Sequence, residues 1–276
     1  MLQLGLIGSP LGHSLSPWLH SNFLEQTELK GEYQLMEIKP ENFPEEISTL
    51  KDREMNGFNV TVPFKREIIP FLDSIDDRAS RLGAVNTVVV QNGKWRGYNT
   101  DGDGYLESVR AVYPDIISSA ERVLIIGSGG AARGIAFSLS GLSLKIDVTN
   151  RTPSRAEELL SDLPEAVRGR FLTLNEAALA LDEYDWVIQT TSVGMAPKAE
   201  EIPIDVKKVK ENALFSDIVY RPLETRFLLE AKRKGARVHY GHLMLLYQAA
   251  YSFALWTNEE VLPASLITEM ESKLEG

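Results

Sequence analysis

The chain of 276 residues contains no cysteine. This absence excludes disulfides, thiolate catalysis, cysteine-ligated zinc and iron–sulfur clusters. It fits a reducing cytoplasm, which is the location we expect. Histidine is scarce as well, and none has the spacing with carboxylates that is typical of a metal site, so no metal is expected; the histidines are His13, His20, His239 and His242.

Basic residues are fewer than acidic ones, with 29 Lys and Arg against 39 Asp and Glu, so the net charge is -10. Binding to nucleic acid or to an anionic membrane surface needs an excess of basic residues, so neither partner is expected. The longest apolar run, 243–256, contains Gln248 and is too short to cross a bilayer. Residues 1–8 have no basic segment and predict a first strand, not a signal peptide.

Strand and helix patterns alternate along the chain and predict two α/β domains. Strands are expected at 4–7, 33–38, 57–62, 84–91 and 94–98, the last two joined by an Asn92-Gly93 hairpin turn. A second series, at 123–126, 145–149, 186–190, 213–218 and 238–240, predicts a doubly wound, Rossmann-type parallel sheet. We expect residues 1–103 with 242–276 to form a substrate-binding and catalytic domain onto which the C-terminal helices pack. Residues 104–241 then form a dinucleotide-binding domain.

A glycine turn follows the apolar run 123–126. Gly127 permits a tight turn, Gly129 lets the backbone approach a phosphate, and Ala132 allows a helix to pack closely on the strand. A strand, a glycine turn and a helix in this order are typical of dinucleotide pyrophosphate sites. Close packing alone also explains such a turn. The residues at the end of the next strand therefore have to distinguish a dinucleotide site from a turn that serves packing only.

That next strand ends at Asn150-Arg151, at about the 20-residue spacing of the dinucleotide fingerprint. A carboxylate here would bind an adenosine ribose and repel a 2′-phosphate, whereas Arg151, with Arg155 nearby, offers positive charge. NADP is therefore favoured over NAD. The alternative is that both arginines are solvated residues at a helix start.

Polar residues gather at predicted loop and strand ends in the first part of the chain: Ser14, Ser16, Asn59, Thr61, Lys65, Asn86 and Asp101. Each has a structural explanation alone, because Ser16 can cap a helix and Asp101 can form an Asx-turn. As a set they supply the hydroxyl and amide groups that a small polyhydroxylated acid needs. Lys65 can donate a proton to a carbonyl oxygen during hydride transfer, and Asp101 can orient its ammonium group.

A series of short motifs occurs in order along nearly the whole chain: residues 8–17, 59–65, 83–87, 99–102, 127–131, 150–152, 191–195, 217–220 and 248–250. Together these motifs resemble the shikimate dehydrogenase family. The resemblance implies reversible, NADPH-dependent reduction of 3-dehydroshikimate to shikimate, a step of chorismate and aromatic amino acid biosynthesis.

The resemblance also assigns residues, with Lys65 and Asp101 as the catalytic pair. It implies substrate contacts from Ser14, Ser16, Thr61, Lys65, Asn86, Asp101, Tyr220 and Gln248. It implies NADP contacts from Asp77, Gly127, Ser128, Gly129, Gly130, Ala131, Asn150, Arg151, Thr152, Ile218 and Gly241. The charge argument adds Arg155 to this set. We expect a monomer or a homodimer.

The chain departs from the family pattern at Tyr240-Gly241-His242-Leu243-Met244, where the family commonly has Asp-Gly-x-Gly-Met. Leu243 fits only where the backbone does not need positive φ. His242, on the first turn of an apolar helix, is expected to be a cap or packing group, not an acid or base. Gln189-Thr190 stands where the family often has Asn-Ala, which we take as ordinary variation at a strand end.

Two other functions remain open. One is an NAD-using quinate/shikimate dehydrogenase, against which Ser16 and Asn150-Arg151 argue modestly. The other is a non-catalytic, NADP-sensing protein, against which the presence of both Lys65 and Asp101 argues.

Overall fold

The computed structural model describes residues 1–12 and 14–275, so His13 lies outside the described residues. The chain folds into two compact units, Met1–Thr100 with Gln248–Pro263, and Asp101–Tyr247 with Ala264–Gly276. Gln248–Pro263 thus groups with the first unit, and the functional domains expected at 1–103 with 242–276 and at 104–241 stay a prediction. The segment after Pro263 groups with the second unit, in which Glu271 lies 3.3 Å from His242.

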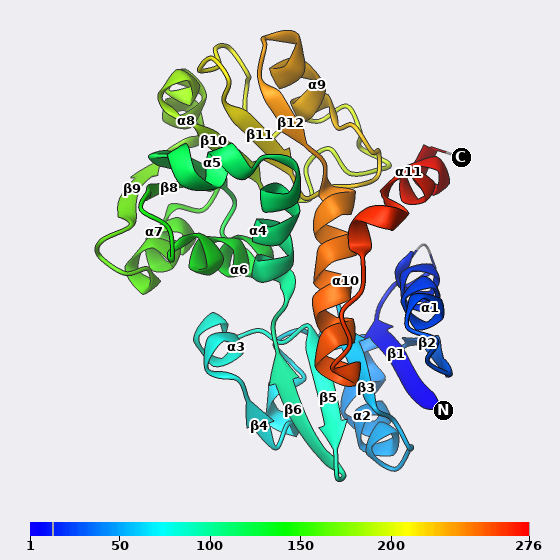
Figure 1. The fold of residues 1–276 in the computed structure, drawn as a ribbon. Coiled ribbons are helices and arrows are strands. Elements are labelled where there is room, and N and C mark those ends of the chain that lie inside the picture. Colours follow the sequence, from blue (N-terminus) through cyan, green and yellow to red (C-terminus); the bar gives the residue numbers. More distant parts are fainter. Residues whose placement is uncertain (13, 276) are drawn as a thin grey trace. The chain divides into compact units, whose positions relative to one another are not determined.

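The first unit contains a six-stranded sheet in the order β2-β1-β3-β5-β6-β4 (Figure 1). Its strands are β1 (Leu2–Gly8), β2 (Gly31–Glu37), β3 (Gly57–Val60), β4 (Ser74–Ile75), β5 (Thr87–Gln91) and β6 (Lys94–Tyr98). β1 runs parallel to β2 and β3, whereas β5 is antiparallel to β3 and β6. The β5–β6 hairpin turns at Asn92 and Gly93, both at positive φ (53° and 73°), as the Asn-Gly pair predicts.

The helices of the first unit are α1 (Ser16–Gln26), α2 (Phe43–Lys51), α3 (Asp77–Leu82) and the second part of α10 (Gly241–Thr257), with 3₁₀ turns at Pro40–Asn42 and Ile69–Phe71. Apolar side chains fill the space between α2 and the sheet, where Phe43 stacks on Phe64 with ring centroids 4.1 Å apart. The cap position of α1 is Leu15, and no side chain caps this helix. The structural explanation of Ser16 as a helix cap is therefore wrong, because Ser16 is already the first helical residue.

The second unit contains a parallel six-stranded sheet in the order β12-β11-β10-β7-β8-β9. Its strands are β7 (Arg122–Ile126), β8 (Lys145–Thr149), β9 (Arg168–Leu172), β10 (Trp186–Gln189), β11 (Leu214–Asp217) and β12 (Arg237–His239). This order is the doubly wound arrangement, with its switch point between β7 and β10. The edge strand β9 is not among the predicted strands, because Arg-Gly-Arg-Phe-Leu has no apolar run.

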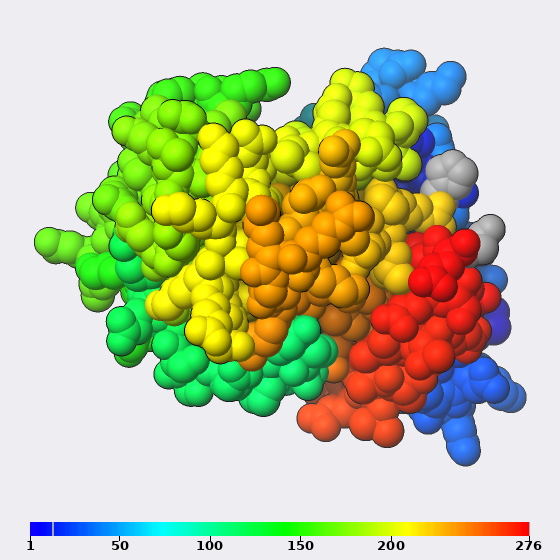
Figure 2. Space-filling view, turned by 90° about the horizontal axis from the view of Figure 1, so that it is seen from above, coloured from blue at the N-terminus to red at the C-terminus, as the bar shows by residue number. Residues whose placement is uncertain are grey.

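The helices of the second unit are α4 (Asp101–Val112), α5 (Pro114–Ser119), α6 (Gly130–Leu139), α7 (Pro153–Asp162), α8 (Leu174–Leu179), α9 (Arg226–Arg233), the start of α10, and α11 (Ile267–Glu275), with a 3₁₀ turn at Leu181–Glu183 and another, Pro263–Leu266, where the chain passes from the first unit back to the second. α4 packs against α6, and a Cβ on Gly102 would lie 2.1 Å from the carbonyl oxygen of Gly134. The last helix, red in Figure 2, lies at the molecular surface with Met270 turned inward. Among the described residues, no helix is both long and apolar enough to cross a membrane.

Candidate functional site

One edge of the first sheet collects most of the predicted substrate residues. β1 and β3 are parallel neighbours with Ile7 opposite Val60, so their carboxyl ends lie side by side. The segment after β1 carries Ser14 and Ser16, and the segment after β3 carries Thr61 and Lys65. β5 runs the other way, and its first residue pairs with Asn59, so Asn86 reaches the same edge.

Main-chain hydrogen bonds fix this edge. The N–H of Thr61 donates to the carbonyl of Ile7 (2.9 Å), and the N–H of Val85 donates to the carbonyl of Lys65 (2.8 Å). The N–H of Val60 donates to the carbonyl of Asn86 (2.8 Å). Thr61, Lys65 and Asn86 therefore belong to one rigid backbone framework.

The side-chain amide of Asn86 is oriented by the main chain. Its Oδ1 accepts from the N–H of Thr100 (2.8 Å), so its Nδ2 is the end that donates to Thr100 Oγ1 (2.9 Å). The same Nδ2 lies 3.4 Å from Oε1 of Gln248, which comes 162 residues later in the chain. The structure thus brings two predicted substrate residues, Asn86 and Gln248, into contact.

The loop that carries Ser14 and Ser16 is tied to β2. Oε2 of Glu37 accepts from the N–H of Leu11 (3.0 Å), and Ser14 Oγ accepts from the N–H of Ser16 (3.2 Å). Ser16 is buried, and so is the phenol of Tyr33, whose pKa is raised by burial. The sequence holds no sign of the part played by Glu37, because its loop partner is distant in the chain.

The predicted catalytic pair falls on both sides of the division between the units. Lys65 is half-buried in the first unit. Asp101 is buried, directly follows the anchored Thr100, and is the first residue of α4 and of the second unit. The pairing of these two side chains stays a prediction.

The glycine turn of the second unit lies at the switch point of its sheet. Gly127 has φ +111°, and a Cβ there would lie 2.6 Å from Thr190 Oγ1 at the end of β10, so this position requires glycine. At Gly129 and Gly130, by contrast, an added Cβ would meet no described atom within 4 Å. No side chain caps α6. Its first N–H groups therefore face space that an anion can enter, which fits a pyrophosphate.

The predicted 2′-phosphate residues follow β8. Asn150 donates from Nδ2 to the carbonyl of Thr152 (3.0 Å), which shapes the turn into α7. Arg151 and Arg155 are both exposed, and neither forms an ion pair with any other described residue. Asp77 lies on the first turn of α3 in the first unit, so the second sheet does not collect it with the other predicted cofactor residues.

The end of β11 carries a buried carboxylate. Asp217 accepts from the N–H of Val219 (2.9 Å) and from the hydroxyl of Thr225 (2.7 Å), and burial raises its pKa to about 7. A Cβ on Gly241 would lie 2.5 Å from the main chain of Ile218 and Val219. Asp217 and Gly241 together fix the segment that leads to Tyr220. The sequence does not reveal this role of Asp217.

The departures from the family pattern fit the backbone. Leu243 lies inside α10 and is not among the residues at positive φ, so it needs no glycine. His242 is fully buried with Nε2 3.3 Å from Glu271, although the geometry is not that of a hydrogen bond. Burial lowers the pKa of His242 to about 4, so this residue is a neutral packing group, as expected.

The side chain of Gln189 has a structural role at the end of β10. Its Oε1 accepts from the N–H of Thr191 (2.8 Å), and its Nε2 donates to the carbonyls of Thr191 (3.1 Å) and Val193 (3.0 Å). The side chain is completely buried. It therefore holds the loop after β10 in shape.

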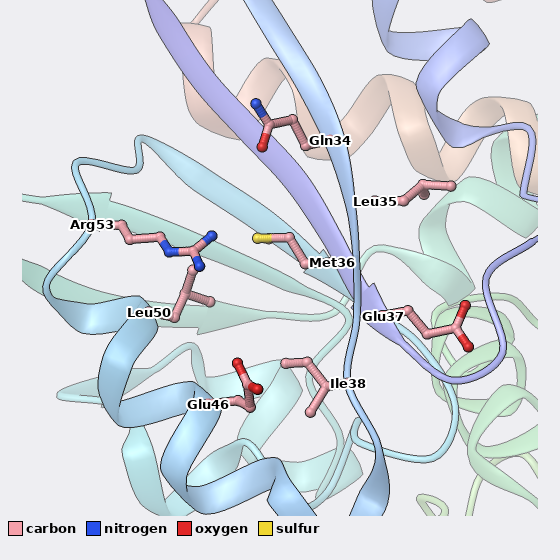
Figure 3. Close-up of a pocket in the computed structure, with 8 residues that line it drawn as sticks. All are labelled: Gln34, Leu35, Met36, Glu37, Ile38, Glu46, Leu50 and Arg53. Atoms are coloured by element: carbon pink, nitrogen blue, oxygen red, sulfur yellow. The ribbon is translucent and has the colours of Figure 1, made fainter.

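A cavity of about 300 Å³ lies elsewhere in the first unit, between β2 and α2 (Figure 3). Met36, Ile38 and Leu50 line it together with the charged Glu46 and Arg53. No predicted site residue lines it, although Glu37, which ties the loop of Ser14 and Ser16 to β2, is among its lining residues.

The fold and its polar sites define a two-domain dehydrogenase of the dinucleotide-binding class. The profile of the shikimate dehydrogenase substrate binding domain matches residues 6–88, and the profile named shikimate / quinate 5-dehydrogenase matches residues 114–224. The chain belongs to the shikimate dehydrogenase family.

Individual relatives match this chain over nearly its full length. The chain is 47% identical to the shikimate dehydrogenase (NADP(+)) of Oceanobacillus iheyensis over 100% of this chain and 99% of that one. Its structure resembles the shikimate 5-dehydrogenase of Thermus thermophilus in complex with NADP(H) and shikimate, with TM-score 0.87, 36% identity, and 96% and 97% of the two chains covered. A shikimate dehydrogenase in complex with NADP+ gives TM-score 0.91 and 35% identity, with 99% and 96% covered.

Proposed function

We propose that this protein catalyses the reversible, NADPH-dependent reduction of 3-dehydroshikimate to shikimate. One observation carries the proposal: the predicted substrate residues of the first unit lie at a single edge of one sheet, where the main chain fixes Thr61, Lys65 and Asn86. Family membership supplies the substrate class. The relatives named above carry the activity in their names or have both ligands bound.

The substrate is held mainly by groups of the first unit. Ser14 and Ser16 offer hydroxyl donors suited to a carboxylate, while Asn86 and Gln248 offer amides suited to ring hydroxyls. Thr61, Asp101 and Tyr220 complete the proposed set. The interlocked amides of Asn86 and Gln248 present donors and acceptors in fixed directions, which favours one arrangement of hydroxyl groups over its epimers.

The cofactor is held by the second unit. The open glycine turn, residues 127–131, receives the pyrophosphate at the start of α6, and Arg151 and Arg155 pair with the 2′-phosphate together with Asn150 and Thr152. Ile218 and Gly241 line the nicotinamide, and Asp77 of the first unit contributes at the edge. Bound NADPH supplies the hydride that reduces the carbonyl carbon.

Lys65 is the proton-transferring group. In the reductive direction its Nζ donates a proton to the carbonyl oxygen of 3-dehydroshikimate, and in the reverse direction it takes that proton from the hydroxyl. Asp101 orients the Lys65 ammonium and accepts a hydrogen bond from a substrate hydroxyl. The helix start at Asp101 and the hydrogen bonds of Thr100 hold this carboxylate in place.

The test compares shikimate and quinate, each with NADP+ and with NAD+, by the absorbance of the reduced cofactor. We expect the highest kcat/KM for shikimate with NADP+. Faster turnover of quinate with NAD+ supports the alternative that the second family profile includes by name. NADP+ binding without turnover of either acid supports a sensing protein. Light scattering on the same sample decides between a monomer and a homodimer.

A further inference from the structure

A buried cluster of polar side chains adjoins the proposed substrate residues of the first unit. Tyr33, Asn59, Thr87, Thr100 and Ser252 form it, and we call it the Asn59 cluster. All five are at most 8% exposed, and Thr87 and Ser252 are completely buried. Buried polar groups are costly unless they are hydrogen bonded, so the arrangement of this cluster is tightly constrained.

The main chain determines which way the Asn59 amide faces. Nδ2 of Asn59 donates to the carbonyl of Asn86 (3.1 Å), so its Oδ1 is the atom that accepts from the hydroxyl of Tyr33 (2.7 Å). The same Nδ2 lies 2.9 Å from Ser252 Oγ and 3.1 Å from Thr87 Oγ1, so its two hydrogens are shared among three oxygens. Asn59 therefore connects β2, β3 and β5 to helix α10.

Ser252 is the member of α10 at which these contacts meet. It lies one turn after Gln248 and donates from Oγ to the carbonyl of Gln248 (3.1 Å). Its Oγ lies 2.8 Å from Thr87 Oγ1 and 3.2 Å from Thr100 Oγ1. Thr87 in turn donates to Oδ1 of Asn86 (2.8 Å), and Thr100 Oγ1 donates to the carbonyl of Gln248 (3.1 Å).

We propose that Ser252 is a positioning residue for substrate binding, because its hydroxyl holds the α10 turn that carries Gln248 in register with the strand end that carries Asn86. This inference rests on the proposed function, in which both amides contact shikimate. Without the hydroxyl, Thr87 and Asn59 lose a buried partner and the contact between Asn86 and Gln248 loosens. Ser252 acts through those two amides and does not itself touch the substrate.

The experiment compares Ser252→Ala with Ser108→Ala. Ser108 is also a completely buried helical serine whose hydroxyl donates to a carbonyl of its own helix, that of Tyr105 (2.7 Å), but it lies in the second unit. For Ser252→Ala we expect KM for shikimate to rise about tenfold, with KM for NADP+ unchanged and kcat reduced much less. For Ser108→Ala we expect both KM values of the parent enzyme. KM does not depend on the fraction of enzyme that is folded, so partial unfolding does not imitate the effect.

A second variant keeps the test decisive where Ser252→Ala folds poorly. Thr87→Val removes the hydroxyl that joins Ser252 to Asn86 and nearly preserves the side-chain shape, and it should also raise KM for shikimate selectively. The inference is overturned if the parent enzyme oxidises shikimate while both variants keep its KM for shikimate. A parent protein that fails to oxidise shikimate would instead overturn the proposed function, so the two failures are distinct.

Discussion

At the scale of single residues, Asp217 is a carboxyl group whose ionised form is costly to bury. A carboxylate that is 1% exposed loses its hydration, and its two hydrogen bonds, from Val219 and Thr225, replace only part of that loss. The pKa therefore rises from 3.8 to about 7. In return, the side chain fixes the turn between β11 and α9.

The raised pKa of Asp217 predicts a pH-dependent stability. In the unfolded chain this carboxyl ionises near pH 3.8, and in the folded protein near pH 7, so folding stability is lost as the pH rises between these values and is constant above. The loss amounts to at most about 4 kcal/mol. Asp217→Asn removes it, so the stability of this variant relative to the parent should increase from pH 5 to pH 7. Urea unfolding across that range measures the difference, and a pH-independent difference would contradict the assigned pKa.

Lys65 offers the most direct test of the proposed chemistry. Lys65→Ala removes the proton donor and should lower kcat by roughly 100-fold or more, with a much smaller change in KM for shikimate. The neighbouring Arg66 is exposed, so Arg66→Ala serves as the control and should keep the parent turnover. Parent-like turnover in Lys65→Ala would remove Lys65 from the mechanism.

Arg151 tests the choice of cofactor. Arg151→Asp places a carboxylate where the 2′-phosphate is expected, so KM for NADP+ should rise at least about tenfold and KM for NAD+ should fall or stay the same. Lys207→Asp makes the same change of charge at another exposed position of the second unit and controls for long-range electrostatics. An unchanged preference between the cofactors in Arg151→Asp argues against the 2′-phosphate site.

At the scale of elements, the turn between β7 and α6 separates glycines needed for folding from glycines needed for a ligand. Gly127 combines positive φ with a close neighbour, whereas Gly129 and Gly130 have neither. At Gly129 the backbone has φ -75° and ψ -173°, which any residue adopts. The structure thus gives no folding reason for glycine at positions 129 and 130. We infer that glycine is needed there so that a phosphate can approach the backbone.

Gly129→Ala should therefore leave stability nearly unchanged and weaken NADP+ binding by about tenfold or more. Gly241→Ala is the matched contrast, because its Cβ would collide with the main chain of Ile218 and Val219. We expect Gly241→Ala to lower the free energy of unfolding by at least about 2 kcal/mol. Thermal unfolding with and without NADP+ measures both effects. Equal loss of stability in the two variants would contradict the distinction.

Much of the element order is predictable from the sequence, for local reasons. The Asn92-Gly93 hairpin and the parallel strands follow from turn chemistry and apolar runs within a few residues. β9 is not predictable in this way, because an edge strand needs few apolar residues. The Asn59 cluster is beyond sequence patterns altogether, since it joins residues up to 193 positions apart.

At the scale of the whole molecule, the chain forms two units, and each takes a segment from the C-terminal part. We assign the substrate to the first unit and the cofactor to the second. Hydrogen exchange measured by mass spectrometry should therefore show shikimate protecting β3, β5 and the second part of α10. NADP+ should protect the β7–α6 turn and the start of α7. Protection of the first sheet by NADP+ alone would contradict this assignment.

The late position of Ser252 also has a consequence for protein synthesis. Asn59 is synthesised 193 residues before Ser252, its hydrogen-bond partner. The carbonyl of Val88 is likewise synthesised long before the indole of Trp256, which donates to it. The early strands can pair as they emerge, but their polar interior stays without these partners until Ser252 and Trp256 have been synthesised. The first unit therefore cannot complete its polar interior as soon as its strands have been synthesised.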